Sequence, residues 1–420
     1  MRLLRRAQRS KHLLLLRLVV VTAARTGHAQ AAELANAYDL LAGAQTDRPS
    51  EVDPLLRHPP VGAWAIQALC DVWRGATVDH GYLAALAAAA ALLARADCAV
   101  EVPLHGGRVF LPFLGTAHLT VRDAPRTAIV RSGPQGGEIR AAGAQLPIPA
   151  NPQHDDGSWW GIRRLTVHAA GPATSFLLDD LDPYRLPGAR TAGHLDAVAL
   201  GQWHRILSDA WALLVANHPE TAEEIAAGVA VLVPLHAPPG CQVSATSRHS
   251  FGAVALSQPQ HGRSFAAALA HERQHVKLGA LLDLVSLIDH PSRTRWYAPW
   301  RDDPRPLGAL LQGAYAHLGV TAFWRQQRHI DRGKAALRAH MEFARWRDET
   351  RDVVATLQTS GALTRCGSRF VDGMAASLDT WAEEPIPAVA VQQAQAVATS
   401  HRRTWRLRHG PIESTTSPQK

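Results

Sequence analysis

One stretch of the sequence combines residue types that can hold a metal ion. His271, Glu272 and His275 form an HExxH motif inside an Ala- and Leu-rich run. Residues four apart lie on the same face of a helix, so the two imidazoles can bind one metal while Glu272 lies beside it. The motif predicts a metal-binding helix; two histidines on a solvated helix face are the alternative.

Two kinds of enzyme use this motif. In a zinc peptidase, the histidines and a third ligand hold the metal, and the motif glutamate activates its bound water. In an iron oxygenase, similar ligands leave open positions for a co-substrate and oxygen. The familiar peptidase extensions are absent, because position 281 is Leu and no Glu lies between Glu272 and Glu342.

The third ligand must therefore come from elsewhere. His317 is the strongest candidate, because it lies on an otherwise apolar face of a helix predicted over 307–328. A buried histidine without a metal is an equally common reading. His290, Asp283 and Asp289 are weaker alternatives.

The proline-rich stretch 296–306 lies before that helix and contains Arg301 and Arg305. An arginine fork suits a carboxylate, so an arginine near an open metal site is what a 2-oxoacid co-substrate requires. The competing expectation is that both arginines pair with Asp302 and Asp303.

Composition excludes several classes of protein. The chain has 420 residues, 46% of them hydrophobic, which is enough for a large core. The net charge of +8 comes mostly from arginines spread along the chain rather than from a basic block, so no nucleic-acid partner is expected. The four cysteines form no CxxC pair, which fits a cytoplasmic protein.

The elements that must position the motif follow from the sequence pattern. We expect an α+β fold, mainly helical, in which an antiparallel β region is inserted between two helical regions. The boundaries are a helical region at 1–99, a mainly β region at 100–178, a helical HExxH metal-binding region at 179–409 and a disordered tail at 410–420.

Three local features refine this outline. Leu13–Val21 is apolar but interrupted by Arg17, which favours an amphipathic helix over a secretory signal and excludes a membrane span. Short strands are expected at Val229–Leu235 and Gly252–Leu256, and Ser264 as the N-cap of the metal helix. The acids of Asp179–Asp182 could bind a hard cation, but capping and ion pairing are favoured because a calcium loop's Gly and closing Glu are missing.

Several segments resemble the HExxH-type peptide-modification proteins, which accompany or are fused to radical SAM maturases of ribosomally made peptides. The resemblance extends over nearly the whole chain. It is carried by Leu4-Arg5-Arg6-Ala7-Gln8, Ser10-Lys11-His12, Leu178–Arg185, Ala270–Leu278, Tyr297–Pro306 and Gly313–Val320.

The resemblance implies an iron(II)- and 2-oxoglutarate-dependent dioxygenase that hydroxylates Cβ of a residue in a ribosomally synthesised precursor peptide. On this reading His271 and His275 bind iron, and the catalytic-site residue Glu272 has no obligatory role as a base and can orient a ligand instead. His317 as third ligand, and Arg301 or Arg305 as the 2-oxoglutarate residue, remain inferences from position.

The implied partners are the precursor peptide and a radical SAM maturase, with no nucleic acid and no membrane. Two alternatives stay open. One is a zinc-dependent metallopeptidase that processes the peptide, and the other is a non-catalytic peptide-binding scaffold.

Overall fold

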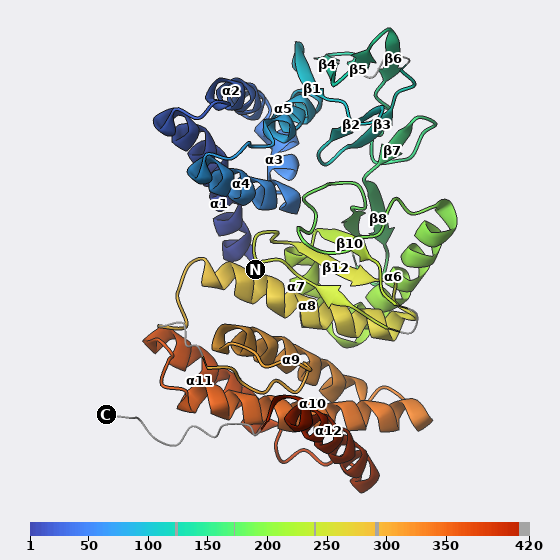
Figure 1. Ribbon diagram of the computed structural model, residues 1–420. Helices are drawn as coiled ribbons and strands as arrows, with labels where there is room; N and C mark the ends of the chain where they lie inside the picture. The colour runs from blue at the N-terminus through green and yellow to red at the C-terminus, as the bar shows by residue number, and fades with distance from the viewer. Residues whose placement is uncertain (122–124, 172, 239–240, 290–293, 411–420) are drawn as a thin grey trace. The chain divides into compact units, whose positions relative to one another are not determined.

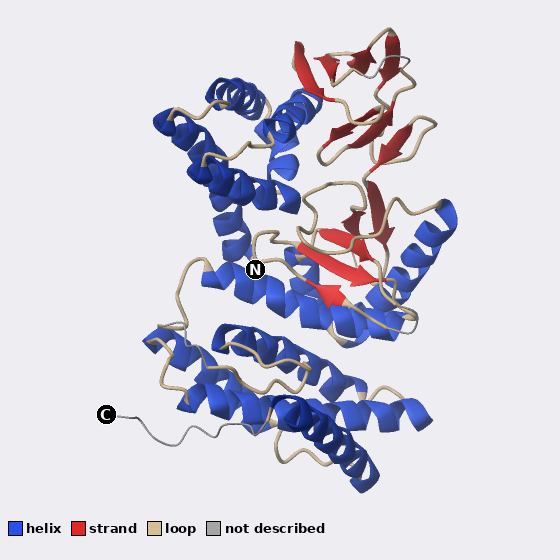
Figure 2. Cartoon of the chain, in the orientation of Figure 1, coloured by secondary structure: helices blue, strands red, loops and turns tan. Residues whose placement is uncertain are grey.

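The structure is a computed structural model that describes residues 1–121, 125–171, 173–238, 241–289 and 294–410 (Figure 1). Its described part combines a majority of helices with antiparallel sheets in the middle of the chain (Figure 2). This confirms the predicted α+β fold class.

The chain forms two compact units. Unit 1 comprises Met1–Ser208 and Ala226–Pro259, and unit 2 comprises Asp209–Ile225 and Gln260–Lys420. The predicted regions at 1–99 and 100–178 therefore lie in one unit, together with a later segment. The reason is a shared core, in which the helix at His80–Ala94 packs against the strands at Cys98–Pro103, Arg108–Leu111 and Thr127–Gly133.

Unit 1 begins with helices, as predicted. The apolar stretch near the N-terminus lies in the first of them, where Leu15, Leu16, Val19 and Ala23 are buried, while Arg17, Leu18 and Val21 are exposed. The helix ends at Gly27, whose φ of 63° is the left-handed conformation that glycine adopts readily. The helices are α1 (Arg2–Thr26), α2 (Ala31–Asp47), α3 (Pro49–Leu56), α4 (Pro59–Arg74) and α5 (His80–Ala94).

Two antiparallel sheets follow, which confirms the predicted β region. One has the strand order β1-β4-β5-β6 and the other β2-β3-β7. The strands are β1 (Cys98–Pro103), β2 (Arg108–Leu111), β3 (Gly115–His118), β4 (Thr127–Gly133), β5 (Gly136–Ala141), β6 (Ala144–Pro147) and β7 (Trp159–Gly161).

A third sheet of unit 1 was only partly predicted. Its order is β11-β12-β10-β9-β8, and β9, β10 and β12 run parallel. The strands are β8 (Arg163–Val167), β9 (Thr174–Leu178), β10 (Val231–Leu235), β11 (Ser244–Ala245) and β12 (Ala253–Ser257). β10 and β12 confirm the two predicted short strands; both are fully buried, as parallel strands usually are.

Between β9 and β10 the chain forms α6 (Ala197–Asn217) and α7 (Pro219–Gly228), and one boundary between the units falls within each of these helices; a third boundary follows Pro259. Unit 2 otherwise consists of helices. They are α8 (Gly262–Leu282), α9 (Leu307–Gln327), α10 (Gly333–Thr359), α11 (Arg365–Thr380) and α12 (Ala388–His409).

The core of unit 2 lies among these helices, where α9 packs against α8, α10 and α11. The predicted helix at 307–328 is therefore confirmed. In the described ranges, no helix is both long and apolar enough to cross a bilayer. Most of the tail predicted to be disordered, 411–420, lies outside the described residues.

Candidate metal centre

The HExxH motif lies in α8, as the sequence predicts. Ser264 is not the N-cap, however. His261 takes that position and accepts a hydrogen bond from the Ser264 backbone NH, while the Ser264 hydroxyl is paired with the His261 backbone in a capping box. An imidazole nitrogen replaces the usual oxygen acceptor, which explains why the pattern of Ser, Thr, Asp and Asn caps missed it.

Buried apolar residues hold one side of α8, and ion pairs hold another. Phe265 and Leu269 are fully buried. Arg273 and Lys277 both pair with Glu224 of α7, the lysine at 2.7 Å. The helix is thereby fixed on two sides, which sets the direction of the histidines between them.

The two motif histidines adjoin each other. Their Nε2 atoms are 3.1 Å apart, and their ring centroids 4.8 Å. Two nitrogens bound to one tetrahedral metal at about 2.0–2.1 Å would lie roughly 3.3 Å apart. The pair of His271 and His275 is therefore spaced as two ligands of one ion would be.

His317 reaches the same place from α9. Its ring centroid is 5.1 Å from that of His271, and its Nδ1 lies 2.9 Å from the carbonyl oxygen of Gly313. Because a carbonyl only accepts, Nδ1 carries the proton and the lone pair is on Nε2, the arrangement found in metal-binding histidines. Trp300 and Trp346 pack on the ring at 4.4 and 4.5 Å.

The three imidazoles are adjacent, but their nitrogens are not all close enough to bind one ion. Across the described chain, one trio alone has all its potential ligand atoms within 4.8 Å of one another, and it is a different one. The nitrogens of His271, His275 and His317 thus include at least one wider separation. Binding one ion through all three would require these nitrogens to come closer together.

Glycines permit the close approach of α9. A Cβ atom on Gly313 would lie 2.4 Å from the Trp300 indole, and one on Gly319 would lie 3.0 Å from the Ala270 carbonyl oxygen of α8. Larger residues at these positions would force the helix, and with it His317, away from the motif.

Burial keeps all three histidines neutral at pH 7. Desolvation lowers the pKa of His271 well below its usual value, and the neighbouring imidazoles lower it further. Desolvation also lowers the pKa of His275 to about 4 and that of His317 to about 3. Since only the neutral ring binds a metal, the site needs no deprotonation before it takes an ion.

Glu272 is almost completely buried, and its Oε1 lies 3.8 Å from Nε2 of His271. This places a carboxylate beside the imidazoles that would bind the ion. There it can accept a hydrogen bond from a metal-bound water or orient a ligand. The position fits both roles considered for the motif glutamate.

The arginines expected to bind a co-substrate are paired with protein. Arg301 and Arg305 both bind Asp303, at 2.9 and 2.8 Å, and 55% and 33% of their side chains are exposed. Asp302 instead pairs with Arg408 of α12. The structure thus shows the acid pairing that was the competing expectation for this loop.

A different arginine, which the sequence did not indicate, lies beside His317. Arg345 of α10 carries a charge that contributes to the low pKa of His317, and its guanidinium lies over the Trp346 ring at 4.2 Å. Its Nε donates to Glu349 at 2.9 Å. Its terminal nitrogens have no hydrogen-bond partner among the described residues.

The weaker candidates for a third ligand are placed as follows. Asp283 caps the C-terminus of α8, twelve residues after His271 and so about 18 Å along the helix. The backbone NH of Asp289 donates a hydrogen bond to the carbonyl oxygen of Ala362. His290 lies outside the described residues.

The trio with close ligand atoms is His58, Asp179 and Asp182, in unit 1. His58 Nε2 lies 3.1 Å from Asp179 and 3.9 Å from Asp182, and all three side chains are buried. Tyr82 donates to Asp182 at 3.0 Å. Burial, and then the neighbouring Asp179, raise the pKa of Asp182 well above its usual value, because a second negative charge beside Asp179 is unfavourable in the buried site.

This trio could hold a metal, although its two acids already have hydrogen-bond partners in the protein; only Nδ1 of His58 is buried without one among the described residues. Asp179 accepts from His58 and from the backbone NH groups of Leu181 and Asp182. The third acid of the stretch, Asp180, pairs with Arg163 and His194. Capping and ion pairing, the favoured sequence interpretation, therefore describe these acids.

Comparison with known proteins does not identify the chain. No protein-family model matches it, and no curated protein is similar to it at a significant level.

Proposed function

We propose that this protein is an iron(II)- and 2-oxoglutarate-dependent dioxygenase that hydroxylates Cβ of a residue in a ribosomally synthesised peptide. His271, His275 and His317 would hold the iron. The observation that carries the proposal is the position of Arg345 beside a cluster of three neutral histidines; its terminal nitrogens have no hydrogen-bond partner in the described part of the chain.

The charges favour an anionic co-substrate. Three neutral imidazoles leave both positive charges of a divalent ion uncompensated by its ligands, so an anion that chelates the metal is attracted to it. A second carboxylate on that anion can bind the planar fork of Arg345. 2-Oxoglutarate has both groups, whereas Arg301 and Arg305 are already engaged with Asp303.

When bound, iron with 2-oxoglutarate and oxygen supplies the oxidising power for C–H hydroxylation, with succinate and carbon dioxide as co-products. The protein's own residues bind and shield. Trp300 and Trp346 hold the His317 ring and limit access of water on their side, while 22% of the His271 side chain stays exposed. Substrate would approach from that exposed side.

The test uses the full-length protein with iron(II), oxygen and 2-oxoglutarate. We expect succinate to form, and a co-expressed precursor peptide to gain the mass of one oxygen without chain cleavage. Absence of 2-oxoglutarate turnover in protein shown to contain iron would reject the proposal.

A zinc-dependent peptidase is the second candidate, and the position of Glu272 favours it. A buried carboxylate 3.8 Å from a motif imidazole is where a general base toward metal-bound water would lie. In that case zinc alone would support cleavage of the peptide into two fragments, and Glu272→Gln would abolish it. A non-catalytic peptide-binding scaffold predicts affinity for the peptide with neither reaction.

The partners follow from the resemblance of the motif segments to peptide-modification proteins. We infer a ribosomally made precursor peptide as substrate and a radical SAM maturase as a partner enzyme. We also infer a cytoplasmic location, since the four cysteines are free thiols.

A further inference from the structure

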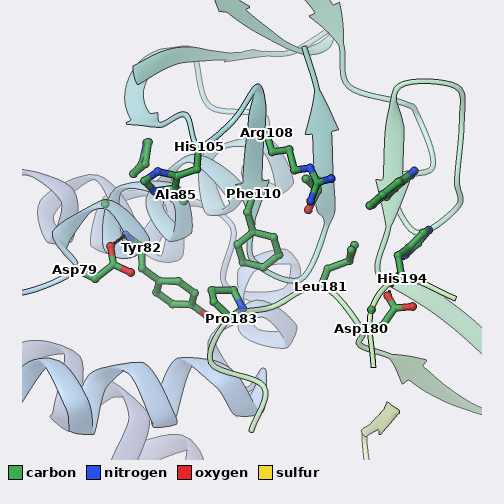
Figure 3. Close-up of a pocket in the computed structure, with 15 residues that line it drawn as sticks. Asp79, Tyr82, Ala85, His105, Arg108, Phe110, Asp180, Leu181, Pro183 and His194 are labelled. Atoms are coloured by element: carbon green, nitrogen blue, oxygen red, sulfur yellow. Dashed lines mark hydrogen bonds and ion pairs between the residues drawn. The ribbon is translucent and has the colours of Figure 1, made fainter. Parts of the chain in front are cut away.

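Unit 1 contains a cavity of about 440 Å³, and none of the residues that line it is part of the candidate metal centre. Its walls are one face of the β2-β3-β7 sheet, the first turns of α5 and the loop that follows β9 (Figure 3). This volume is in the range of pockets that take small organic ligands.

Strand register builds the sheet wall. Phe110 of β2 and Trp160 of β7 both pair with Thr116 of β3, and Arg108 pairs with His118. Side chains of paired residues, and of residues two apart, lie on the same face. All five therefore project from one side, while the other side packs Val109 and Ala117 into the core.

Stacked rings hold the Trp160 indole in place. His194 lies parallel to it, with centroids 4.5 Å apart and an angle of 8°, and His118 lies at 4.0 Å. His194 is itself held by Asp155 and Asp180, each at 3.2 Å. The hydrogen bonds to His194 thus fix the orientation of the Trp160 indole in the absence of a ligand.

Two groups on this wall lack a protein partner. The Arg108 guanidinium lies over the Trp160 ring at 5.3 Å and forms no ion pair with any described residue. Thr116 is 6% exposed, yet within the described ranges its hydroxyl makes no hydrogen bond. Arg108 is exposed, and both groups border the cavity, so a ligand there can offer each of them an acceptor.

The opposite wall limits the ligand's charge. Asp79 lies at the start of α5, where it caps the helix and accepts from Tyr184. Asp180 also borders the cavity and is fully engaged with Arg163, His194 and the Leu195 backbone. Arg108 is thus a single cation without an ion pair among the described residues, and it shares the cavity with the carboxylates of Asp79 and Asp180. This arrangement suits a ligand with one negative charge better than a phosphate with two.

Apart from His105, the remaining lining is mostly apolar. Phe110, Tyr82, Leu181 and Pro183 surround the space between Arg108 and Asp79 (Figure 3). Flat rings on several sides favour an aromatic ligand body, because offset and edge contacts between rings add to the gain from burial.

We propose that this cavity binds an aromatic monocarboxylate, with the carboxylate on Arg108 and Thr116 and the ring against Phe110 and Trp160. Either a free aromatic acid or the carboxyl-terminal aromatic residue of a peptide has this chemistry. The site is independent of the proposed oxygenase activity.

Calorimetry on the full-length protein tests the proposal with N-acetylphenylalanine and its uncharged amide. We expect saturable binding of the acid, at least about tenfold weaker binding of the amide, and a loss of about tenfold or more in Arg108→Gln. Thr116→Val should weaken binding about three- to tenfold, since it removes one neutral hydrogen bond.

Matched variants make the result specific. Arg131→Gln changes an exposed arginine on β4, outside the cavity, and should leave affinity within about twofold of the wild-type value. His271→Ala/His275→Ala should bind the acid normally; loss of binding there would assign the ligand to the metal centre and overturn the proposal. Equal binding of acid and amide, or no saturable binding, would also overturn it.

Two further probes tell the sources apart. If the natural ligand is a free acid, 3-phenylpropionate should bind more tightly than N-acetylglycylphenylalanine. The reverse order would assign the cavity to a peptide carboxyl terminus. Both orders support an aromatic carboxylate site, and failure of all these acids to bind would reject it.

Discussion

The Nδ1 atom of His317 lies 2.9 Å from the Gly313 carbonyl oxygen, one turn earlier in α9. This contact fixes the tautomer of His317 and aims the lone pair of Nε2 away from its own helix. It also identifies Gly313 as a residue with two functions, because the same glycine leaves room for the Trp300 indole.

His317→Phe tests whether this histidine binds the metal. Phenylalanine keeps a ring between Trp300 and Trp346 but offers no donor, so we expect metal affinity to fall more than the roughly 10- to 100-fold typical of a residue that only supports a ligand. Competition with a chromogenic chelator measures it. Unchanged affinity would make His317 a packing residue.

His271→Ala and His275→Ala should each abolish stoichiometric metal binding without loss of helix content. The two Nε2 atoms, 3.1 Å apart, would share one ion, so neither histidine alone replaces the pair. Elemental analysis and circular dichroism provide the two measurements. His329→Ala, at an exposed histidine of unit 2, is the control, and full occupancy in both motif variants would contradict the prediction.

Arg345→Gln should raise the KM for 2-oxoglutarate about 10- to 100-fold, since it removes charge-assisted hydrogen bonds to a carboxylate. The change leaves Glu349 buried without its arginine, so Arg345→Gln/Glu349→Gln serves as the matched background. Arg301→Gln/Arg305→Gln should have the smaller effect. Steady-state succinate production measures all three, and the opposite ranking would return the role to the proline-rich loop.

Buried His12 predicts a loss of stability in acid. Desolvation lowers its pKa from 6.5 to about 4. The unfolded chain therefore binds a proton that the folded chain does not, and stability present above pH 6.5 is lost as the pH falls toward 4, by about 3 kcal/mol in total. Urea unfolding at pH 7, 6 and 5 should show a shallower pH slope for His12→Gln; equal slopes would disprove the assignment.

Removal of the His58 ring should destabilise unit 1. His58→Ala leaves the carboxylate of Asp179 buried without its side-chain partner, which we expect to cost about 3–5 kcal/mol of unfolding free energy. Chemical denaturation measures the change, with the exposed His154→Ala as control. If the trio instead holds an ion, wild-type protein will lose stability on dialysis against a chelator, and the Ala variant will not respond.

Periodicity explains which elements were predictable. The α8 and α9 helices repeat apolar residues every three to four positions, and β10 and β12 are short apolar runs bounded by turns, so local sequence defines both types. The parallel pairing of β10 with β9 joins strands more than fifty residues apart. The local sequence of a strand does not show which distant strand it pairs with, so the strand partners were not predicted.

The same limit applies to the candidate centre. His271 and His275 are four residues apart and could be paired from the sequence, whereas Arg345 and Trp346 reach His317 from the next helix through tertiary packing. Arg301 and Arg305 were attractive because they precede the third histidine, but the neighbouring Asp303 binds them both. The nearby acid in the same loop was therefore a better guide to the partners of these arginines than their position before His317.

The interleaving of the two units has a consequence for synthesis on the ribosome. β8 and β9 emerge first, but their sheet waits for β10 and β12, which follow only after the Asp209–Ile225 segment of unit 2. Until about residue 257 has left the exit tunnel, the nascent chain presents an unpaired strand edge. Release of the chain at residue 208 would make that edge permanent, so this fragment should aggregate rather than fold.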